Sequence, residues 1–482
     1  MLRLCVLLSG CLAFVGLAFV AAGPLAATPP RPTPTPTERP TPAPVVSFRT
    51  FVPTPVASAT STAFVPLVAT PTAVSPTLAA TPEALDPPEL RAVWVDAFHD
   101  GFKTPAQVDD LVAWARAANL NALFVQVRRR GDAYYLKSIE PRSEDPGLAP
   151  GFDALQYLID RAHQGPRRLQ VHAWLATLPI WGERDMPPTS PGHAFNLRGP
   201  TADLALTWLM YRDDGEAWAG TESSGIYYLD PGNPDARDFT TEVYLNLLRN
   251  YDVDGIHMDQ VRYYEGDALR WGYNPTSVAI FNGTFGRDPE SVPAPADPQW
   301  VAWRRDQVTA LVRSIYTRAK ALKPNVAVTA AVVTWGKGPR TADDWESQPA
   351  YASVLQDWRS WLRQGIVDYL LPMDYYREAG LQAGWFDTWT RWEVTNAGNR
   401  GVVLGLGTYL NSADGALAQL GRARALGALG VAFYSYAVPT ADLENASADE
   451  RQAFAAQLRS VFARPAPVPD LPTTLVVATP SP

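Results

Sequence analysis

The chain has 482 residues and a net charge of −8, and 46% of its residues are hydrophobic. This acidic balance argues against a nucleic-acid partner, because a phosphate-binding surface normally carries an excess of basic residues. Both cysteines, Cys5 and Cys11, lie in the N-terminal apolar segment. The rest of the chain therefore has no disulfide framework, no cysteine zinc site and no thiol nucleophile.

Residues 1–27 are apolar, with a positive charge at Arg3 and small residues near the end. This composition predicts a secretory signal peptide. A run of roughly 20 apolar residues is also long enough for a retained membrane anchor, and Leu8-Ser9-Gly10-Cys11 resembles a bacterial lipoprotein box. Cleavage, anchoring and lipidation all stay open. Each predicts an exported protein, extracellular or attached to the cell envelope, that contacts the membrane only through this segment.

Two segments are rich in Pro, Thr and Ala, namely residues 28–88 and 465–482. They cannot form a packed core, because proline lacks a backbone donor and large apolar side chains are few. We expect a disordered, polyproline-like linker in the first and a disordered tail in the second. Residues 89–464 between them are predicted to form one folded domain.

The domain alternates strand patterns with helix patterns. Strands are predicted at residues 91–98, 121–128, 169–175, 253–259, 326–333, 367–374, 402–409 and 430–436. Helices are predicted at residues 104–118, 152–163, 233–250, 300–322, 351–364, 381–396, 414–426 and 446–462. Eight such repeats indicate the α/β class and a (β/α)8 TIM barrel with loop insertions on its C-terminal face. An open doubly wound sheet is disfavoured, because no Gly-rich phosphate turn follows the first strand.

The fourth predicted strand ends on a carboxylate. The period-two alternation of a strand places Gly255, His257 and Asp259 on one face. Burying His257 and Asp259 costs free energy unless they are paired or used. In a TIM barrel, catalytic side chains come from such strand ends. Asp259 is therefore the first candidate for a catalytic role, and its structural alternative is a strand-end cap paired with Arg262 or Arg128.

Carboxyl groups among aromatic rings suit carbohydrate chemistry, since glycosidic cleavage requires a pair of carboxyl groups. We predict Asp259 as the acid/base and Asp374, at the end of the sixth strand, as its partner. Loop alternatives for the partner are Glu183, Asp230 and Glu378. The residues predicted to bind the sugar are Asp96, Gln126, Arg128, Trp174, His257, Arg262, Trp335, Tyr375, Tyr409 and Tyr436. The tryptophans in this list fit an alternative role equally well, as packing residues of the barrel.

Other hydrolytic chemistries find no support in the sequence. The sequence contains no His-Glu-x-x-His motif, which would suggest a zinc hydrolase. It also contains no Gly-x-Ser-x-Gly motif, which would suggest an esterase. The two-carboxylate mechanism requires no metal and no organic cofactor.

Five blocks of the domain, in order, resemble the glycosyl-hydrolase-like family 10 of bacterial envelope proteins. They are Arg91 to Trp94, Phe124 to Tyr135, Val171 to Trp174, Tyr228 to Arg237, and Tyr251 to Asp259. The resemblance implies a TIM-barrel fold similar to glycosidases, export, and in some members cleavage of peptidoglycan glycan strands. The chain departs from the family pattern at Gln260, where the family commonly has a second acid, at Arg262-Tyr263-Tyr264 after it, and at Met373-Asp374 in the sixth strand.

These observations predict an exported enzyme that hydrolyses O-glycosyl bonds in a cell-envelope or extracellular polysaccharide, with peptidoglycan glycan as the leading substrate. The alternative is a non-catalytic carbohydrate-binding envelope protein on the same scaffold.

Overall fold

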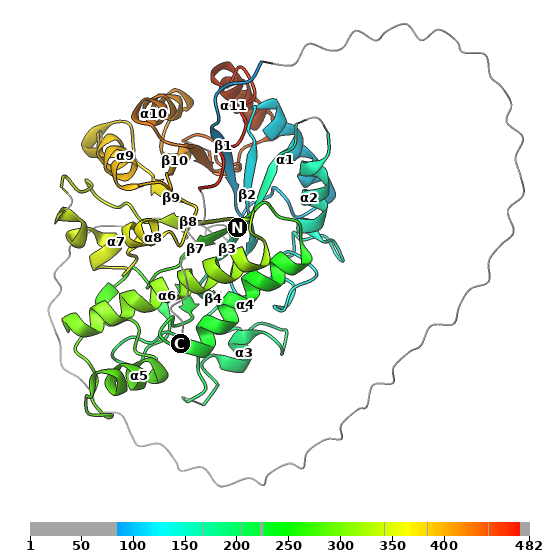
Figure 1. Ribbon diagram of the computed structural model, residues 1–482. Coiled ribbons are helices and arrows are strands. Elements are labelled where there is room, and N and C mark those ends of the chain that lie inside the picture. Colours follow the sequence, from blue (N-terminus) through cyan, green and yellow to red (C-terminus); the bar gives the residue numbers. More distant parts are fainter. Residues whose placement is uncertain are drawn as a thin grey trace, which may run out of the picture. The chain divides into compact units, whose positions relative to one another are not determined.

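The computed structural model describes residues 84–472, apart from residues 166, 204, 222–224, 342, 383 and 442. The predicted signal or anchor segment and the linker up to residue 83 lie outside the described residues. Within them, parallel strands close into a barrel that helices surround (Figure 1). The prediction of a (β/α)8 TIM barrel is confirmed.

All eight predicted strands are present in the barrel. They are β1 (Leu90–Val95), β2 (Ala122–Arg128), β3 (Gln170–Ala176), β7 (Gly255–Asp259), β8 (Ala327–Val332), β9 (Tyr369–Asp374), β10 (Val403–Gly407) and β11 (Gly430–Tyr434). They pair in this order around the barrel, and β11 closes on β1. The C-terminal ends of all these strands therefore lie at one end of the barrel, which we call the mouth.

The described helices cover the outside of the barrel or lie in the insertions between its strands. They are α1 (Pro105–Ala117), α2 (Ala154–His163), α3 (Ala194–Arg198), α4 (Pro234–Asn250), α5 (Pro275–Phe285), α6 (Pro298–Leu322), α7 (Pro349–Ala352), α8 (Trp358–Gln364), α9 (Trp385–Asn396), α10 (Ala413–Leu426) and α11 (Ala448–Val461). The predicted N-terminus of α1 is confirmed, since Thr104 accepts a hydrogen bond from the amide of Gln107 and Pro105 begins the helix.

The helix predicted at residues 351–364 is wrong, because the chain breaks between α7 and α8. Leu355 adopts a left-handed backbone conformation with φ of 56°. The side chain of Gln356 then accepts a hydrogen bond from the amide of Val333 at 2.9 Å, just after β8. Asp357 caps α8. The break thus ties this helical segment to the end of a strand.

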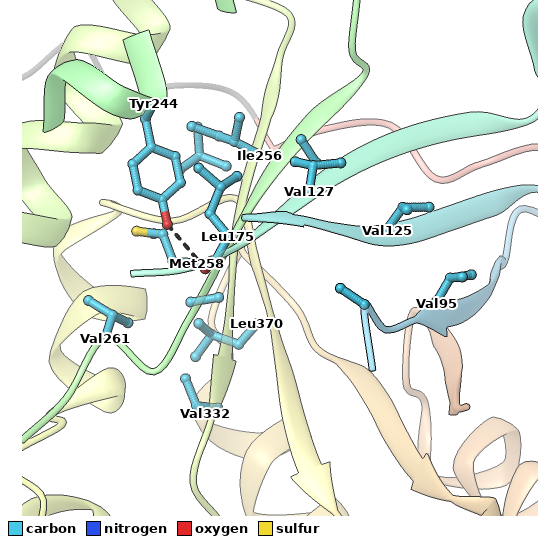
Figure 2. Close-up of a cluster of buried hydrophobic side chains, with 14 of the residues drawn as sticks. Val95, Val125, Val127, Leu175, Tyr244, Ile256, Met258, Val261, Val332 and Leu370 are labelled. Carbon is cyan, nitrogen blue, oxygen red and sulfur yellow. Dashed lines mark hydrogen bonds between the residues drawn. The ribbon is translucent and has the colours of Figure 1, made fainter. Parts of the chain in front are cut away.

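Alternation along the strands separates two cores. One set of side chains fills the barrel interior: Leu90, Ala92, Trp94, Ala122, Phe124, Trp174, Ala327, Tyr369, Leu371, Val403 and Ala432. The opposite faces of the strands pack on the helices, as Val125, Ile256 and Leu370 do in Figure 2. In the same view the hydroxyl of Tyr244, from α4, donates to the carbonyl of Leu175 at 3.4 Å. Every barrel strand is thus buried on both faces.

The barrel has two long insertions, at about residues 176–232 and 265–299, and both have structure of their own. The first contains α3 and a small antiparallel sheet of β4 (Pro179–Trp181), β6 (Gly225–Tyr228) and β5 (Ala219–Gly220). The second contains α5. A separate cluster of Tyr273, Phe281, Trp300 and Trp303 packs α5 on α6, where the two tryptophan rings stack at 5.1 Å.

Chain segments from both ends of the described region meet at the base of the barrel, opposite the mouth. The amide of Asp86 donates to the carbonyl of Pro465 at 2.8 Å, and that of Glu89 to Pro467 at 3.0 Å. Val468 packs on the inner core. Residues 465–472 thus contact the barrel although their composition predicts the start of a disordered tail, and residues 473–482 lie outside the described region. None of the described helices is long and apolar enough to span a membrane.

Candidate active site

Asp259 ends β7 at the mouth of the barrel, with 15% of its side chain exposed. The indole nitrogen of Trp174 donates to its Oδ2 at 3.1 Å, and the amide of Gln260 donates to its Oδ1 at 2.6 Å. A guanidinium nitrogen of Arg262 lies 3.7 Å from Oδ1. Burial raises the pKa of Asp259 above its usual value, and Arg262 and the two donors partly offset this effect. Burial thus makes the carboxyl group a weaker acid than a free aspartic acid.

His257 lies one pleat below Asp259, fully buried in the barrel interior. The indole N–H of Trp94 donates to its Nε2 at 3.3 Å, and its Nδ1 lies 2.9 Å from the hydroxyl of Thr329. An indole nitrogen can only donate, so Nε2 accepts and Nδ1 carries the proton. Burial holds the pKa of His257 well below its usual value. The predicted role in sugar binding does not fit this position, because the neutral ring belongs to the barrel core.

The predicted meeting of Asp374 and Asp259 does not occur. Inward positions on β9 are Tyr369 and Leu371, so Asp374 faces the helices. There its carboxyl group is fully buried, close to that of Glu393 on α9. Asp374 is therefore separated from the mouth by its own strand.

Three tyrosines at the ends of β9, β10 and β11 form an aromatic group. The rings of Tyr375 and Tyr434 stack with centroids 5.3 Å apart, and Tyr409 meets both edge-on at 5.9 and 6.0 Å. All three are half-buried. Tyr434 also meets Trp174, at 6.4 Å, which links this tyrosine group to the donor of Asp259.

Tyr434 was not among the predicted sugar-binding residues, whereas Tyr436 was. The ring of Tyr436 instead packs edge-on against Trp114 of α1 at 5.1 Å, and the guanidinium of Arg451 lies 4.8 Å from its centroid. Tyr436 therefore belongs to the helix layer. Continuing the inward alternation from Ala432 would have selected Tyr434.

Arg128 and Gln126 make internal contacts near the end of β2. The buried guanidinium of Arg128 pairs with both oxygens of Glu140 at 2.8 Å and donates to the carbonyl of Ala176. Gln126 accepts a hydrogen bond from the amide of Ala97 at 3.0 Å. Both side chains thus hold the ends of neighbouring strands together. The guanidinium of Arg128 is used up in these internal contacts, whereas only the Oε1 of Gln126 is engaged.

The remaining predicted residues are placed as follows. Trp335, just after β8, is half-buried and packs on the outer core. The carboxyl group of Asp96, just after β1, is buried and accepts hydrogen bonds from the following turn. Among the described residues, no group of three or more His, Cys, Asp or Glu side chains is arranged to hold a metal ion.

The three loop acids weighed as alternatives to Asp374 have other partners. Glu183 is exposed and lies 3.3 Å from Arg130. Both oxygens of Glu378 pair with Arg422. Asp230 is fully buried and accepts a hydrogen bond from the amide of Gly232. Desolvation by burial raises its pKa to about 7. None of these contacts brings a carboxyl group to Asp259.

The architecture and the strand-end carboxyl group define a TIM-barrel protein with a candidate site at its mouth. The chain matches the glycosyl hydrolase-like 10 family over residues 89–416 and belongs to that family. The resemblance seen in the sequence is thus confirmed.

The chain is similar to two curated relatives. It is 28% identical over 340 residues to glycosyl hydrolase YngK of Bacillus subtilis, covering 66% of this chain and 60% of the relative. It is also 28% identical over 300 residues to glycosyl hydrolase DigH of Escherichia coli, covering 60% and 62%. The match therefore spans about three fifths of the length of these relatives.

Solved structures share the fold. The glycoside hydrolase domain of PgaB (BpsB) from Bordetella bronchiseptica superposes with a TM-score of 0.51 at 17% identity, covering 72% of this chain and 94% of that domain. Alpha-L-fucosidase isoenzyme 2 from Paenibacillus thiaminolyticus gives a TM-score of 0.51 at 15% identity, covering 78% and 49%. At these identities the likeness concerns the fold alone.

Proposed function

We propose that this protein is a glycoside hydrolase that acts on a polysaccharide outside the cytoplasm, with Asp259 as its general acid. The family and the names of the two curated relatives support the reaction class. The observation that carries the proposal is the position of Asp259. It is a carboxyl group at a strand end, partly exposed at the mouth, with its pKa raised by burial.

A general acid must hold its proton until it transfers it to the leaving oxygen. The direction of the pKa shift at Asp259, upward through burial, suits this step. The donors on its two oxygens, from Trp174 and Gln260, fix the orientation of the carboxyl group. Arg262 beside it stabilises the carboxylate that remains after the proton has left.

The tyrosine group of Tyr375, Tyr409 and Tyr434 is the proposed sugar platform. Aromatic faces pack on the C–H faces of pyranose rings, and tyrosine hydroxyls can bind sugar hydroxyls. Peptidoglycan glycan is the leading substrate, supported by the family resemblance and by the predicted export of the chain.

A second candidate is a carbohydrate-binding protein without hydrolytic activity. The observation that favours it is the lack of an obvious second acid. The position after Asp259 is Gln260, whose side chain donates to the hydroxyl of Tyr228 at 3.5 Å, and Asp374 faces away from the mouth.

The test compares wild type with Asp259→Asn on glycan strands stripped of their peptides. In this substrate new reducing ends can only come from glycosidic cleavage. We expect release by wild type and a loss of about 10²-fold or more in Asp259→Asn, the typical contribution of a general acid. Asp252→Asn, with an exposed side chain just before β7, is the matched control. Binding of the strands without any release by wild type would support the second candidate and reject the hydrolase.

A further inference from the structure

The side chains of Trp94 and His257 meet inside the barrel although they come from strands that are not neighbours. Their ring centroids lie 6.0 Å apart, and the indole N–H of Trp94 donates to Nε2 of His257. Between β1 and β7 the barrel order inserts β2 and β3. This contact therefore crosses the interior.

The next inward positions on the same two strands, toward the mouth, are acidic. Side chains on a strand return to the same face every second residue. Asp96 follows Trp94 by two residues, and Asp259 follows His257 by two. The two carboxyl groups thus lie one layer above a pair of side chains that touch, on strands three positions apart around the barrel.

The surroundings of Asp96 leave one of its oxygens without a partner. Its Oδ1 accepts three hydrogen bonds, from the amide of Phe98 at 2.9 Å, the amide of His99 at 3.0 Å and the Nδ1 of His99 at 2.8 Å. Its Oδ2 is buried and has no donor. A buried carboxylate oxygen without a partner is uncommon in folded proteins and calls for an explanation, of which a catalytic role is one. The bonds to Oδ1 fix the carboxyl group, and Oδ2 is the oxygen left to accept a proton.

We propose that Asp96 is the general base that acts opposite Asp259, an inference that rests on the proposed glycosidase function. Oδ2 of Asp96 takes a proton from a water molecule whose oxygen bonds to the anomeric carbon. The bond from that carbon to the leaving oxygen breaks, and Asp259 gives its proton to the leaving oxygen. The products are two sugar hydroxyl groups, and one proton passes from Asp96 back to Asp259 through solvent to restore the starting state.

The spacing of these two layers of side chains also predicts the stereochemical course. An indole and an imidazole ring together just span the interior from β1 to β7. Aspartate side chains are shorter than either, so Asp96 and Asp259 leave a gap between their carboxyl groups. Inverting glycosidases separate their carboxyl groups by roughly 6.5–9.5 Å to admit a water molecule, whereas retaining enzymes hold them at about 5–5.5 Å. We therefore expect inversion.

The experiment uses the full chain and peptide-free glycan strands. Asp96→Asn keeps a carbonyl oxygen for the three donors on Oδ1, so the turn after β1 is retained. We expect its rate to fall by about 10²-fold or more, with a thermal midpoint close to that of wild type. Asp100→Asn, an exposed acid on the same turn, should keep the wild-type rate. In Asp96→Ala, added azide should restore turnover and give a glycosyl azide of inverted configuration.

Two competing results would overturn the inference and leave the hydrolase in place. One is a wild-type rate for Asp96→Asn together with an inactive Glu265→Gln, since Glu265 is an exposed acid on the loop after β7. The other is an NMR spectrum of the first product that shows retention. If wild type releases no reducing ends, the proposed function and this inference fail together.

Discussion

Asp374 of β9 and Glu393 of α9 are two completely buried carboxyl groups that lie close enough to interact. No cation pairs with either group in the described structure, and the nearby titratable side chain is that of Tyr376. Burial raises the pKa of Asp374 to about 7 and that of Glu393 well above its usual value. The pair therefore holds at least one proton at neutral pH, because two charges in contact without a cation would be costly.

Stability should fall as pH rises from about 4 to 7. In this range the unfolded chain loses protons from both acids, whereas the folded pair keeps at least one. The free energy of unfolding then declines by up to about 1.4 kcal/mol per pH unit for each group that titrates in this way. Denaturation curves at pH 5, 6, 7 and 8 measure the decline. Glu393→Gln should flatten it and Glu346→Gln, which changes an exposed acid, should not. An unchanged slope in Glu393→Gln would show that the pair does not share a proton.

Glu140→Gln should destabilise the domain without altering its chemistry. The change leaves the buried guanidinium of Arg128 without its counter-charge, and breaking a buried ion pair typically costs about 3–5 kcal/mol. Urea denaturation gives the loss. Turnover per folded molecule should stay at the wild-type value. A large rise in KM would instead indicate that Arg128 contributes to sugar binding.

Trp174→Phe should move the alkaline limb of the pH–rate profile. The indole hydrogen bond to Oδ2 lowers the pKa of Asp259, so its removal raises that pKa further. A general acid with a higher pKa keeps its proton to higher pH, and the limb of kcat/KM should shift upward. Profiles recorded under conditions where both proteins are folded test this. If the limb does not move, it reports the titration of a group other than Asp259.

Substitutions of Tyr434, the last residue of β11, and of Tyr436, two residues later, should distinguish a substrate contact from a packing contact. Tyr434→Ala removes a ring of the tyrosine group, and we expect KM to rise about tenfold, or about 1.4 kcal/mol of binding. Tyr436→Ala removes a ring buried against Trp114 and should cost about 3 kcal/mol of stability. KM per folded molecule should then stay unchanged. The opposite pattern would place Tyr436 in the substrate site.

The sequence predicts the barrel well, because apolar runs and helix caps are local signals. From Gly255 to Asp259 the alternation predicts the inward face correctly, since polar residues on one face mark the interior. The alternation does not locate Asp374 and Tyr436, because their strands are apolar on both faces and hydropathy does not distinguish inward from outward positions. Which residues of a strand face the interior is known only once one inward residue of that strand, such as Leu371 or Ala432, has been identified. The break after α7 depends on a side chain bonding to a distant strand, which no local pattern encodes.

The hydrogen bonds that join Asp86 and Glu89 to Pro465 and Pro467 have a mechanical consequence. The chain enters and leaves the domain at adjacent points on its closed end. A pulling force applied to the domain through either of these segments would act first on the hydrogen bonds at this end. The strand ends that carry Asp96 and Asp259 lie at the other end of the barrel and would bear less of the force.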